Sequence, residues 1–228
     1  QFGLGRGLWY AVFHSVSAFC NAGFDLMGVN SPFSSLTDYV GDPLVSNVIA
    51  FLIIIGGVGF LTWNDIREHK LHFRRYRLQS KLILTTTLAL ILTGLLFFLL
   101  YEFEQGQWVD MSLWERINAA FFQSVTPRTA GFNTVDLTGL SQPAQLLIIL
   151  LMLVGGSPGS TAGGFKTTTL AVMLLGIRAV FRHKERPQCF GRRIADESIR
   201  NASAIFLLYL LLFLTGGILC LLYTSDAA

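Results

Sequence analysis

The chain has 228 residues, of which 52% are hydrophobic and only 14% are charged. Soluble globular domains carry about 25% charged residues, so this composition excludes an ordinary soluble enzyme or binding module. The formal net charge is +3, but the basic residues cluster between apolar runs, which is typical of membrane topology rather than of nucleic-acid binding.

Four runs without charged residues each have about the 20 residues that an α-helix needs to cross a bilayer. They cover residues 43–63, 82–101, 143–165 and 202–223. We therefore predict an all-α, multi-pass membrane protein that has the lipid bilayer as its surroundings and no nucleic-acid partner.

The first element is a short helix over residues 7–19, rich in aromatic residues and too short to span. It breaks into a small-residue loop, Asn21-Ala22-Gly23-Phe24, and a polar external connection follows at residues 31–42. Irregular backbone at membrane depth is tolerated only where it is buried in protein or lines a water-filled path. The pattern predicts a re-entrant pore loop.

After Pro43 the chain crosses inward, and the cluster Gly56-Gly57-x-Gly59 favours close helix packing over a ligand loop. A basic segment at residues 64–80 follows, and the run at residues 82–101 returns outward.

A second short helix begins at Ser112, and the Ser-x-x-Glu spacing to Glu115 predicts a capped helix start. Pro127 forbids its continuation, and the loop Thr129-Ala130-Gly131-Phe132 then repeats the first loop, with Gly131 108 residues after Gly23. The C-terminal end of a helix carries partial negative charge. Two such helices aimed at one axis favour a cation between them.

A filter that strips water from K+ replaces the hydration shell with backbone carbonyl oxygens. Gly23 and Gly131 can adopt the conformations that this requires, and we expect Phe24 and Phe132 to pack the loops from behind. Arg128 would repel a cation from inside the pore. We expect its guanidinium to lie behind the loop as a brace, bound to carbonyls or a carboxylate.

Two acidic residues, Asp25 and Asp136, lie just beyond the loops. Each is either an ordinary solvated acid or a charge that concentrates cations at the mouth of the pore. The three cysteines, Cys20, Cys189 and Cys220, are too few and too scattered for a disulfide framework or a metal site.

The third apolar run is interrupted at its middle, where residues 155–169 are rich in glycine, serine and threonine. From Gly159 it nearly fits a phosphate-binding loop, but Phe165 separates Gly164 from Lys166 and no βαβ pattern surrounds it. We interpret the segment as a gate inside the membrane, with Lys166 and the threonines facing water or loop carbonyls. The gate residues are Gly155, Gly156, Ser157, Pro158, Gly159, Ser160, Thr161, Ala162, Gly163, Gly164 and Lys166.

Thirteen of the seventeen basic residues lie in two stretches, residues 67–81 and 178–200, while most acidic residues lie in the other connections. The positive-inside bias places the basic loops in the cytoplasm, so both pore-like loops enter from outside. The basic runs could also contact anionic lipids. An enzyme or an ATP-driven pump component would need paired carboxylates, a His/Cys cluster or a phosphorylation loop, and the sequence offers no such pattern.

The pattern of spans and loops repeats along the chain. Residues 1–63 are a pore repeat without its first span, and residues 64–80 are a cytoplasmic loop. Residues 81–182 are a complete repeat that contains the gating loop at 155–166. Residues 183–200 are a second cytoplasmic loop, and residues 201–223 are the first span of a further repeat. We expect a fragment of a larger repeat protein, in which Thr224 to Ala228 need not be native.

The two loop peptides and the segment 155–169 resemble the Trk/Ktr/HKT family of potassium transporters, and most closely the membrane-embedded component of bacterial Ktr systems. Loop residues 21–24 are similar to the second filter loop of that family, 126–135 to the third, and 155–169 to its intramembrane gating loop. The resemblance covers residues 7–220 and implies a pseudo-fourfold pore, of which this chain supplies about half and does not conduct alone.

The resemblance also implies K+ uptake across the plasma membrane, with K+ held by carbonyls around Gly23 and Gly131 and with Na+ as a possible coupling or activating ion. It implies no covalent cofactor, a homodimer, and a cytosolic ring of nucleotide-binding regulatory subunits that docks on the basic loops. A sodium or non-selective monovalent cation transporter of the same family stays open, because the first and fourth filter loops lie outside this chain. Channel-like and ion-coupled transport both stay open, as does the identity of the regulatory nucleotide.

Overall fold

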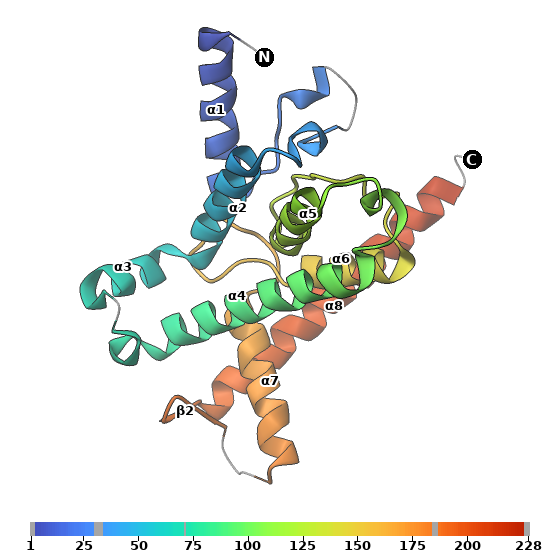
Figure 1. The fold of residues 1–228 in the computed structure, drawn as a ribbon. Coiled ribbons are helices and arrows are strands. Elements are labelled where there is room, and N and C mark those ends of the chain that lie inside the picture. Colours follow the sequence, from blue (N-terminus) through green and yellow to red (C-terminus); the bar gives the residue numbers. More distant parts are fainter. Residues whose placement is uncertain (1–2, 30–33, 71, 184–186, 226–228) are drawn as a thin grey trace. The chain divides into compact units, whose positions relative to one another are not determined.

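The computed structural model describes residues 3–29, 34–70, 72–183 and 187–225, and almost all of their regular structure is helical (Figure 1). The chain divides into two compact units, Gln1–Thr167 and Thr168–Ala228. The helices of the first unit are α1 (Leu4–Phe19), α2 (Pro43–Val58), α3 (Phe60–His69), α4 (Leu78–Phe97), α5 (Leu113–Val125) and α6 (Gln142–Leu153). Short 3-10 turns lie at Met27–Val29, Thr37–Tyr39, Phe73–Arg75 and Gly106–Trp108.

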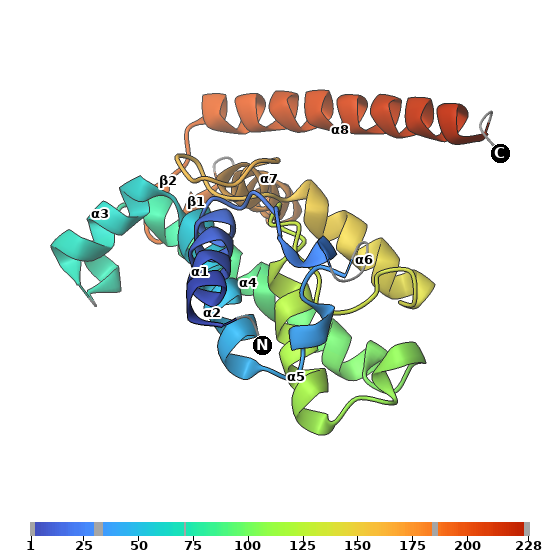
Figure 2. The same cartoon turned by 90° about the horizontal axis from the view of Figure 1, so that it is seen from above.

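The two short helices are held by longer ones. Helix α1 packs along α2, and α5 packs against both α4 and α2 (Figures 1 and 2). Gly94 of α4 permits the close approach of α5, because a Cβ there would lie 2.9 Å from the Cβ of Ser124. This packing brings the C-terminal ends of α1 and α5, where the two loops begin, into the same region of the unit.

Local sequence signals explain where these helices begin. Asp42 precedes Pro43 and accepts hydrogen bonds from the first amides of α2. The predicted capping box of α5 is confirmed, with Ser112 and Glu115 each accepting a backbone hydrogen bond from the other residue. The predicted end of α5 before Pro127 is also confirmed, since the helix stops at Val125.

A buried carboxylate joins α4 to α6. Helix α4 continues as one π-helical turn, Phe98–Glu102, and the Glu102 side chain is fully buried. It accepts hydrogen bonds from both the backbone amide and the hydroxyl of Ser141, the N-cap of α6. A negative charge at a helix N-terminus is stabilised by the helix dipole, so Glu102 fixes the start of α6.

The apolar run at residues 43–63 does not form one straight helix. Helix α2 ends at Val58, and α3 leaves it at an angle of 93°. Gly59 lies at the bend with φ of 92°, in the left-handed region that favours glycine. Helix α3 also extends to His69, so the first part of the predicted loop 64–80 is helical.

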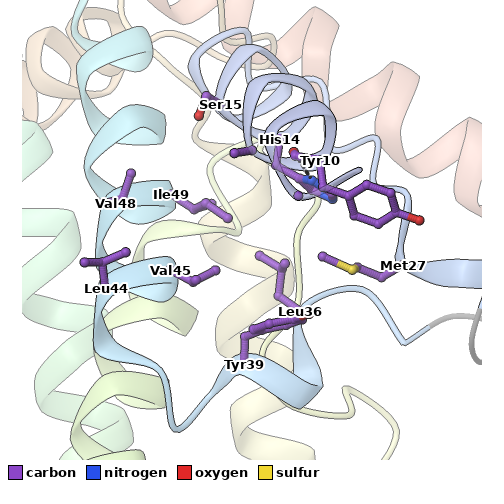
Figure 3. A pocket seen from close by; sticks show the side chains of 12 residues that line it. Tyr10, His14, Ser15, Met27, Leu36, Tyr39, Leu44, Val45, Val48 and Ile49 are labelled. Atoms are coloured by element: carbon purple, nitrogen blue, oxygen red, sulfur yellow. Dashed lines mark hydrogen bonds between the residues drawn. The ribbon is translucent and has the colours of Figure 1, made fainter. Parts of the chain in front are cut away.

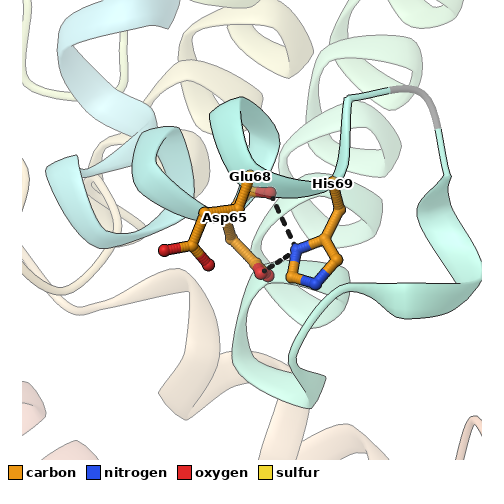
Figure 4. A group of neighbouring side chains, drawn as sticks. All are labelled: Asp65, Glu68 and His69. Atoms are coloured by element: carbon orange, nitrogen blue, oxygen red, sulfur yellow. Dashed lines mark hydrogen bonds and ion pairs between the residues drawn. The ribbon is translucent and has the colours of Figure 1, made fainter.

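Helix α3 is tied to the start of α4 by Asp65, whose side chain is almost fully buried. Its Oδ2 accepts from the Arg77 amide at 2.8 Å, and its Oδ1 lies 3.0 Å from His69 Nδ1 (Figure 4). Glu68 lies close enough that these three side chains could share a metal ion, while the hydrogen bond from the Arg77 amide to Asp65 Oδ2 links α3 to the start of α4. The cluster therefore joins two helices.

The second unit contains α7 (Thr167–Phe181), which starts in the first unit's last residue, and α8 (Asp196–Ser225). A small antiparallel hairpin, β1 (Gln188–Cys189) and β2 (Arg192–Arg193), lies between them. Phe190 and Gly191 both have positive φ, as a two-residue hairpin turn requires. The sequence reasoning did not predict this hairpin.

Two helices are long and apolar enough to cross a membrane, Leu78–Glu102 and Asp196–Tyr223, and the bent pair α2–α3 brings the number to three among the described residues. No residue in the apolar window of α8 is buried in protein, so its surface requires lipid or neighbouring helices. The all-α membrane fold class is confirmed, with the short hairpin as an addition.

Candidate cation pathway

The two predicted loops share one backbone geometry. In the first, Asn21 and Gly23 have positive φ, at 51° and 73°, and the intervening residue does not. In the second, Thr129 and Gly131 have positive φ, at 68° and 85°. Positive φ is uncommon outside glycine, so the same pattern at matched positions shows that the repeated peptide is also a repeated conformation.

A hydroxyl residue that precedes each loop makes two hydrogen bonds to the loop backbone, one through its carbonyl and one through its hydroxyl; we call this pair of bonds the clasp. The Ser17 carbonyl accepts from the Ala22 amide at 2.9 Å, and its hydroxyl donates to the Phe24 carbonyl at 2.7 Å. Thr126 does the same in the second loop, bonding the amide of Ala130 and the carbonyl of Phe132.

These two hydroxyl residues were missed by the sequence reasoning. The alignment of the two peptides contained the signal, because Ser17 and Thr126 occupy the same position in it. A small hydroxyl residue at one position of both copies indicates a hydrogen bond that both copies make.

The loops lie directly against each other. A Cβ on Gly23 would lie 2.6 Å from the Ala130 carbonyl oxygen, and a Cβ on Gly131 would lie 3.0 Å from the Gly23 Cα. Both glycines therefore serve close backbone approach as well as positive φ. Beyond the loops, the Leu36 amide donates to the Asn133 carbonyl at 2.8 Å, which joins the two exits.

The aromatic residues that end the loops behave differently. Phe132 is fully buried and lies in the apolar core with Phe122 and Val125. Phe24 is 70% exposed, so the expectation that it packs behind its loop is wrong for this chain. Its exposure is the main difference between the two copies.

Arg128 is 6% exposed, which agrees with a place behind the loop. The expected carbonyl or carboxylate partner is not found among the described residues, where its Nε has no hydrogen-bond partner. A buried charged donor without a partner is costly, and the brace role of Arg128 therefore stays a prediction.

The acids beyond the loops form turns. Asp25 Oδ1 accepts from the Met27 amide at 2.9 Å. Asp136 Oδ1 accepts from both the amide and the hydroxyl of Thr138, and these hydrogen bonds hold the pKa of the Asp136 carboxyl below its usual range. Asp136 is therefore a charged turn residue at neutral pH.

The predicted interruption of the third apolar run is confirmed, because residues 154–166 between α6 and α7 are not helical. This segment folds back on itself: the Gly155 amide donates to the Phe165 carbonyl at 2.9 Å and the Gly156 amide to the Gly163 carbonyl at 3.1 Å. A Cβ on Gly155 would lie 2.0 Å from the Gly163 oxygen. Because these glycines have no side chains, residues 155–156 can lie in direct contact with residues 163–165.

The folded segment fills the bend between α2 and α3. The amides of Ser157 and Thr161 donate to the carbonyls of Gly57 and Gly56 at the end of α2. In return the Phe60 amide, at the start of α3, donates to the Gly159 carbonyl at 3.0 Å. Backbone groups that a broken helix leaves unpaired are thereby satisfied.

The same segment is hydrogen-bonded to both loops. Thr161 Oγ1 donates to the Phe19 carbonyl at 2.8 Å and accepts from Asn21 Nδ2 at 3.1 Å. The Gly163 amide donates to Thr129 Oγ1 at 3.1 Å. Since Asn21 and Thr129 are matched loop positions, the segment touches each loop at the same point.

Lys166 lies at the end of this segment, where its Nζ donates to the Ala162 carbonyl at 2.8 Å. Lys166 thus faces carbonyls of its own segment, and the expectation that Lys166 and the three following threonines face water or loop carbonyls stays a prediction. Ser157 and Thr167 pair through their hydroxyls at 3.0 Å, which joins the segment to the first residue of α7.

A cavity of about 330 Å³ adjoins the second loop. It is lined by Ala22, Gln123, Thr126, Pro127, Thr129, Ala130, Gly131, Asn133, Leu137, Ile148 and Met152. Gln123 is fully buried, and neither its Nε2 nor its Oε1 has a hydrogen-bond partner within the described part of the chain.

Comparison with known proteins gives one consistent result. The sequence profile of the TrkH family, described as cation transport proteins, matches residues 4–224. The chain is 41% identical over 206 residues to the potassium/sodium uptake protein NtpJ of Enterococcus hirae, covering 90% of this chain and 44% of that protein. It is 37% identical over 228 residues to the Ktr system potassium uptake protein B of Bacillus subtilis, covering 100% of this chain and 50% of that protein.

Among solved structures, the potassium transporter TrkH from Vibrio parahaemolyticus matches with a TM-score of 0.71 at 20% identity. The match covers 91% of this chain and 44% of that one. The fold is therefore shared, and the chain spans about half the length of the relatives it matches.

Proposed function

The chain belongs to the TrkH family of cation transport proteins, and on this premise we propose that it forms two adjacent walls of a K+ filter together with the gate beneath them. The observation that carries the proposal is the repeated loop geometry: two matched backbones, with left-handed residues at matched positions, touch through Gly23 and Gly131.

The chemistry of the loops suits a cation. Each follows the C-terminal end of a short helix, where the dipole favours positive charge, and each presents backbone that is clasped by a hydroxyl residue. Backbone carbonyls held in this way can replace the water around K+. The ion is the cargo, and the proposed function needs no covalent cofactor and no catalytic residue.

Residues 155–166 are the proposed gate. Their hydrogen bonds to Phe19, Asn21 and Thr129 place the segment against both loops. Their bonds to Gly56 and Gly57 connect it to the α2–α3 bend. A movement of this segment would therefore change the space next to the filter, which supports a gating role.

The topology and partners belong to the same proposal. We place the protein in the plasma membrane, with the basic loops 64–80 and 183–200 in the cytoplasm and both filter loops entering from outside. The functional unit is a homodimer whose basic loops dock a ring of nucleotide-binding regulatory subunits. The positive charge of both loops suits an acidic docking partner.

The choice between K+ and Na+ is part of the test. One relative is named a potassium/sodium uptake protein and another a potassium uptake protein. Na+ therefore stays the alternative cargo, or a coupling ion, and uptake of both ions has to be measured.

The deciding experiment substitutes Gly131→Asp in a full-length transporter carrying this segment, expressed in cells that lack K+ uptake systems. The side chain would collide with the first loop and place a carboxylate beside the ion path, so we expect growth at low K+ to fail or the K+/Na+ uptake ratio to change. The control is Gly57→Ala, because a Cβ on Gly57 meets no atom within 4 Å. Normal growth and an unchanged ratio in Gly131→Asp would refute the filter.

The gate is tested by deleting residues 155–164 in the same transporter. Removing a barrier should raise the maximal rate of K+ uptake. A lower or unchanged rate, at an expression level equal to that of the parent, would contradict the gating role.

A further inference from the structure

His14 lies on α1, on the face that packs toward α2, and only 5% of it is exposed. Its ring points into a cavity of about 250 Å³ beside Met27 and Leu36 (Figure 3). Nδ1 lies 2.7 Å from the Tyr10 carbonyl, and Nε2 lies 3.2 Å from the Leu26 amide nitrogen. Both ring nitrogens are thus engaged with backbone.

These two contacts specify the protonation state of the ring. A backbone amide can only donate, so Nε2 must be an unprotonated acceptor. The single ring proton is then on Nδ1, where it donates to the Tyr10 carbonyl. Only the neutral Nδ1–H form of His14 makes both hydrogen bonds.

The bond to Leu26 holds the outer end of the first loop. Leu26 is two residues beyond Phe24, whose carbonyl is held by Ser17. The His14 ring also lies 6.4 Å, centroid to centroid, from the ring of Phe132. One side chain therefore fixes the exit of the first loop and contacts the buried aromatic residue of the second.

The second pore helix carries glutamine at the matched position, Gln123. A glutamine amide can accept from a backbone amide and donate to a carbonyl, as neutral histidine does, but it does not titrate. Gln123 is the counterpart of His14 in sequence position only, because neither its Nε2 nor its Oε1 has a hydrogen-bond partner among the described residues.

We propose that His14 is a positioning residue for the filter and that its protonation loosens the exit of the first loop. A second proton on Nε2 removes the acceptor and sets two N–H groups against each other, so the Leu26 amide loses its partner. Acid that protonates the ring would therefore reduce K+ uptake. This inference rests on the proposed filter function.

The surroundings of His14 offer no direct counter-charge. On α1 its neighbour is Tyr10, with the Arg6 guanidinium 5.7 Å from the Tyr10 ring centroid. Asp25, next to Leu26, already accepts from the Met27 amide. The 3-10 turn Thr37–Tyr39 contributes Tyr39, with Asp38 and Asp42 near its phenol, whereas α2 contributes aliphatic side chains to the cavity. Among the described residues, none of these acids forms an ion pair with His14.

The first experiment measures K+ uptake from pH 5.5 to 8 in a full-length transporter carrying this segment, with His14→Gln and His14→Ala. We expect uptake by the parent to fall toward the acid end of this range. His14→Gln should keep the neutral-pH rate and lose this pH dependence, whereas His14→Ala should be slow at every pH. The control is Val12→Ala, an exposed position on the same helix, which should follow the parent profile.

A parent-like pH profile in His14→Gln would overturn the inference. Hydrogen exchange at one fixed pH supplies a readout that does not depend on transport. His14→Ala should speed exchange in peptides that contain Leu26, and His14→Gln should not. Equal exchange in His14→Ala and the parent would also overturn it. The two proposals can fail separately. Normal transport by Gly131→Asp would refute the proposed filter, whereas slow exchange at Leu26 that depends on His14 would still show that the hydrogen bond holds this residue.

Discussion

The first and second loops have the same backbone but different support. Both have left-handed residues at matched positions and a hydroxyl residue that clasps the loop. The second loop ends in Phe132, which is fully buried, whereas the first ends in Phe24, which is 70% exposed. The first loop instead has a polar contact from His14, whose Nε2 accepts from the Leu26 amide.

This difference separates the features that the proposed ion site needs from those that only hold each loop in place. The features common to both loops concern the direction of the backbone, and these are the features that an ion would sense. The features that differ concern how each loop is held by the rest of the protein. Substitutions that affect the common features should therefore change transport most, and those that affect one support should change stability or regulation.

The largest effect should come from the two glycines that touch. Gly23→Ala and Gly131→Ala each place a Cβ at positive φ, and the first also drives it to 2.6 Å from the Ala130 oxygen. Strain of this kind costs about 1–3 kcal/mol per residue, and the proposed filter requires that the loops stay in contact. We expect K+ uptake to be abolished by Gly23→Ala and severely reduced by Gly131→Ala. Normal uptake by either variant would mean that close contact between the loops is unnecessary.

The next effect tests the unequal support. Phe132→Ala removes a fully buried ring, and such truncations cost about 3–5 kcal/mol. Phe24→Ala removes an exposed ring and should change stability by less than about 0.5 kcal/mol. Thermal unfolding of the two purified full-length variants in the same detergent would measure the contrast. Equal losses of stability would show that Phe24 is covered in the complete protein.

A smaller effect should follow loss of the clasp. Thr126→Val and Ser17→Ala each leave a loop carbonyl without its hydroxyl donor, and a typical hydrogen bond contributes about 1 kcal/mol. We expect a moderate loss of K+ uptake and a lower K+/Na+ ratio, of similar size in both variants because the bond is common to both loops. Thr126→Ser and Ser17→Thr keep the hydroxyl and should restore both quantities. A loss of K+ uptake in only one of the two variants would show that the two loops do not depend equally on this hydrogen bond.

Helix α5 and the two loops could be predicted from the sequence because each has a local sequence signal. Ser112 and Glu115 mark the start of α5, Pro127 marks its end, and the repeated Ala-Gly-Phe marks the loops. The interruption at residues 155–166 was equally clear, since so many glycines cannot remain in one helix. These features depend on neighbours in the chain, and a sequence displays such neighbours directly.

The contacts between distant segments were not visible. Nothing local pairs Thr161 with Phe19, 142 residues earlier, or pairs residues 157–161 with the end of α2 beside the bend at Gly59. The exposure of Phe24 was missed for the same reason, because an identical tripeptide receives different neighbours in the two halves. Long-range packing decides such positions, and the local pattern alone does not.

The smallest predicted effect compares the exits of the two loops under acid. The pKa of the Asp136 carboxyl is lowered by hydrogen bonds from Thr138. The contribution of these bonds to folding stability is therefore complete at any pH above the pKa of an aspartate in an unfolded chain, about 3.9. It is lost only as the pH falls through the lower folded value. Between pH 5.5 and 8 the exit of the second loop should therefore not respond, and Asp136→Asn should keep the pH profile of K+ uptake while His14→Gln removes it. A profile altered by Asp136→Asn in this range would place a titrating group at the second exit, and the difference between the loops would then lie elsewhere.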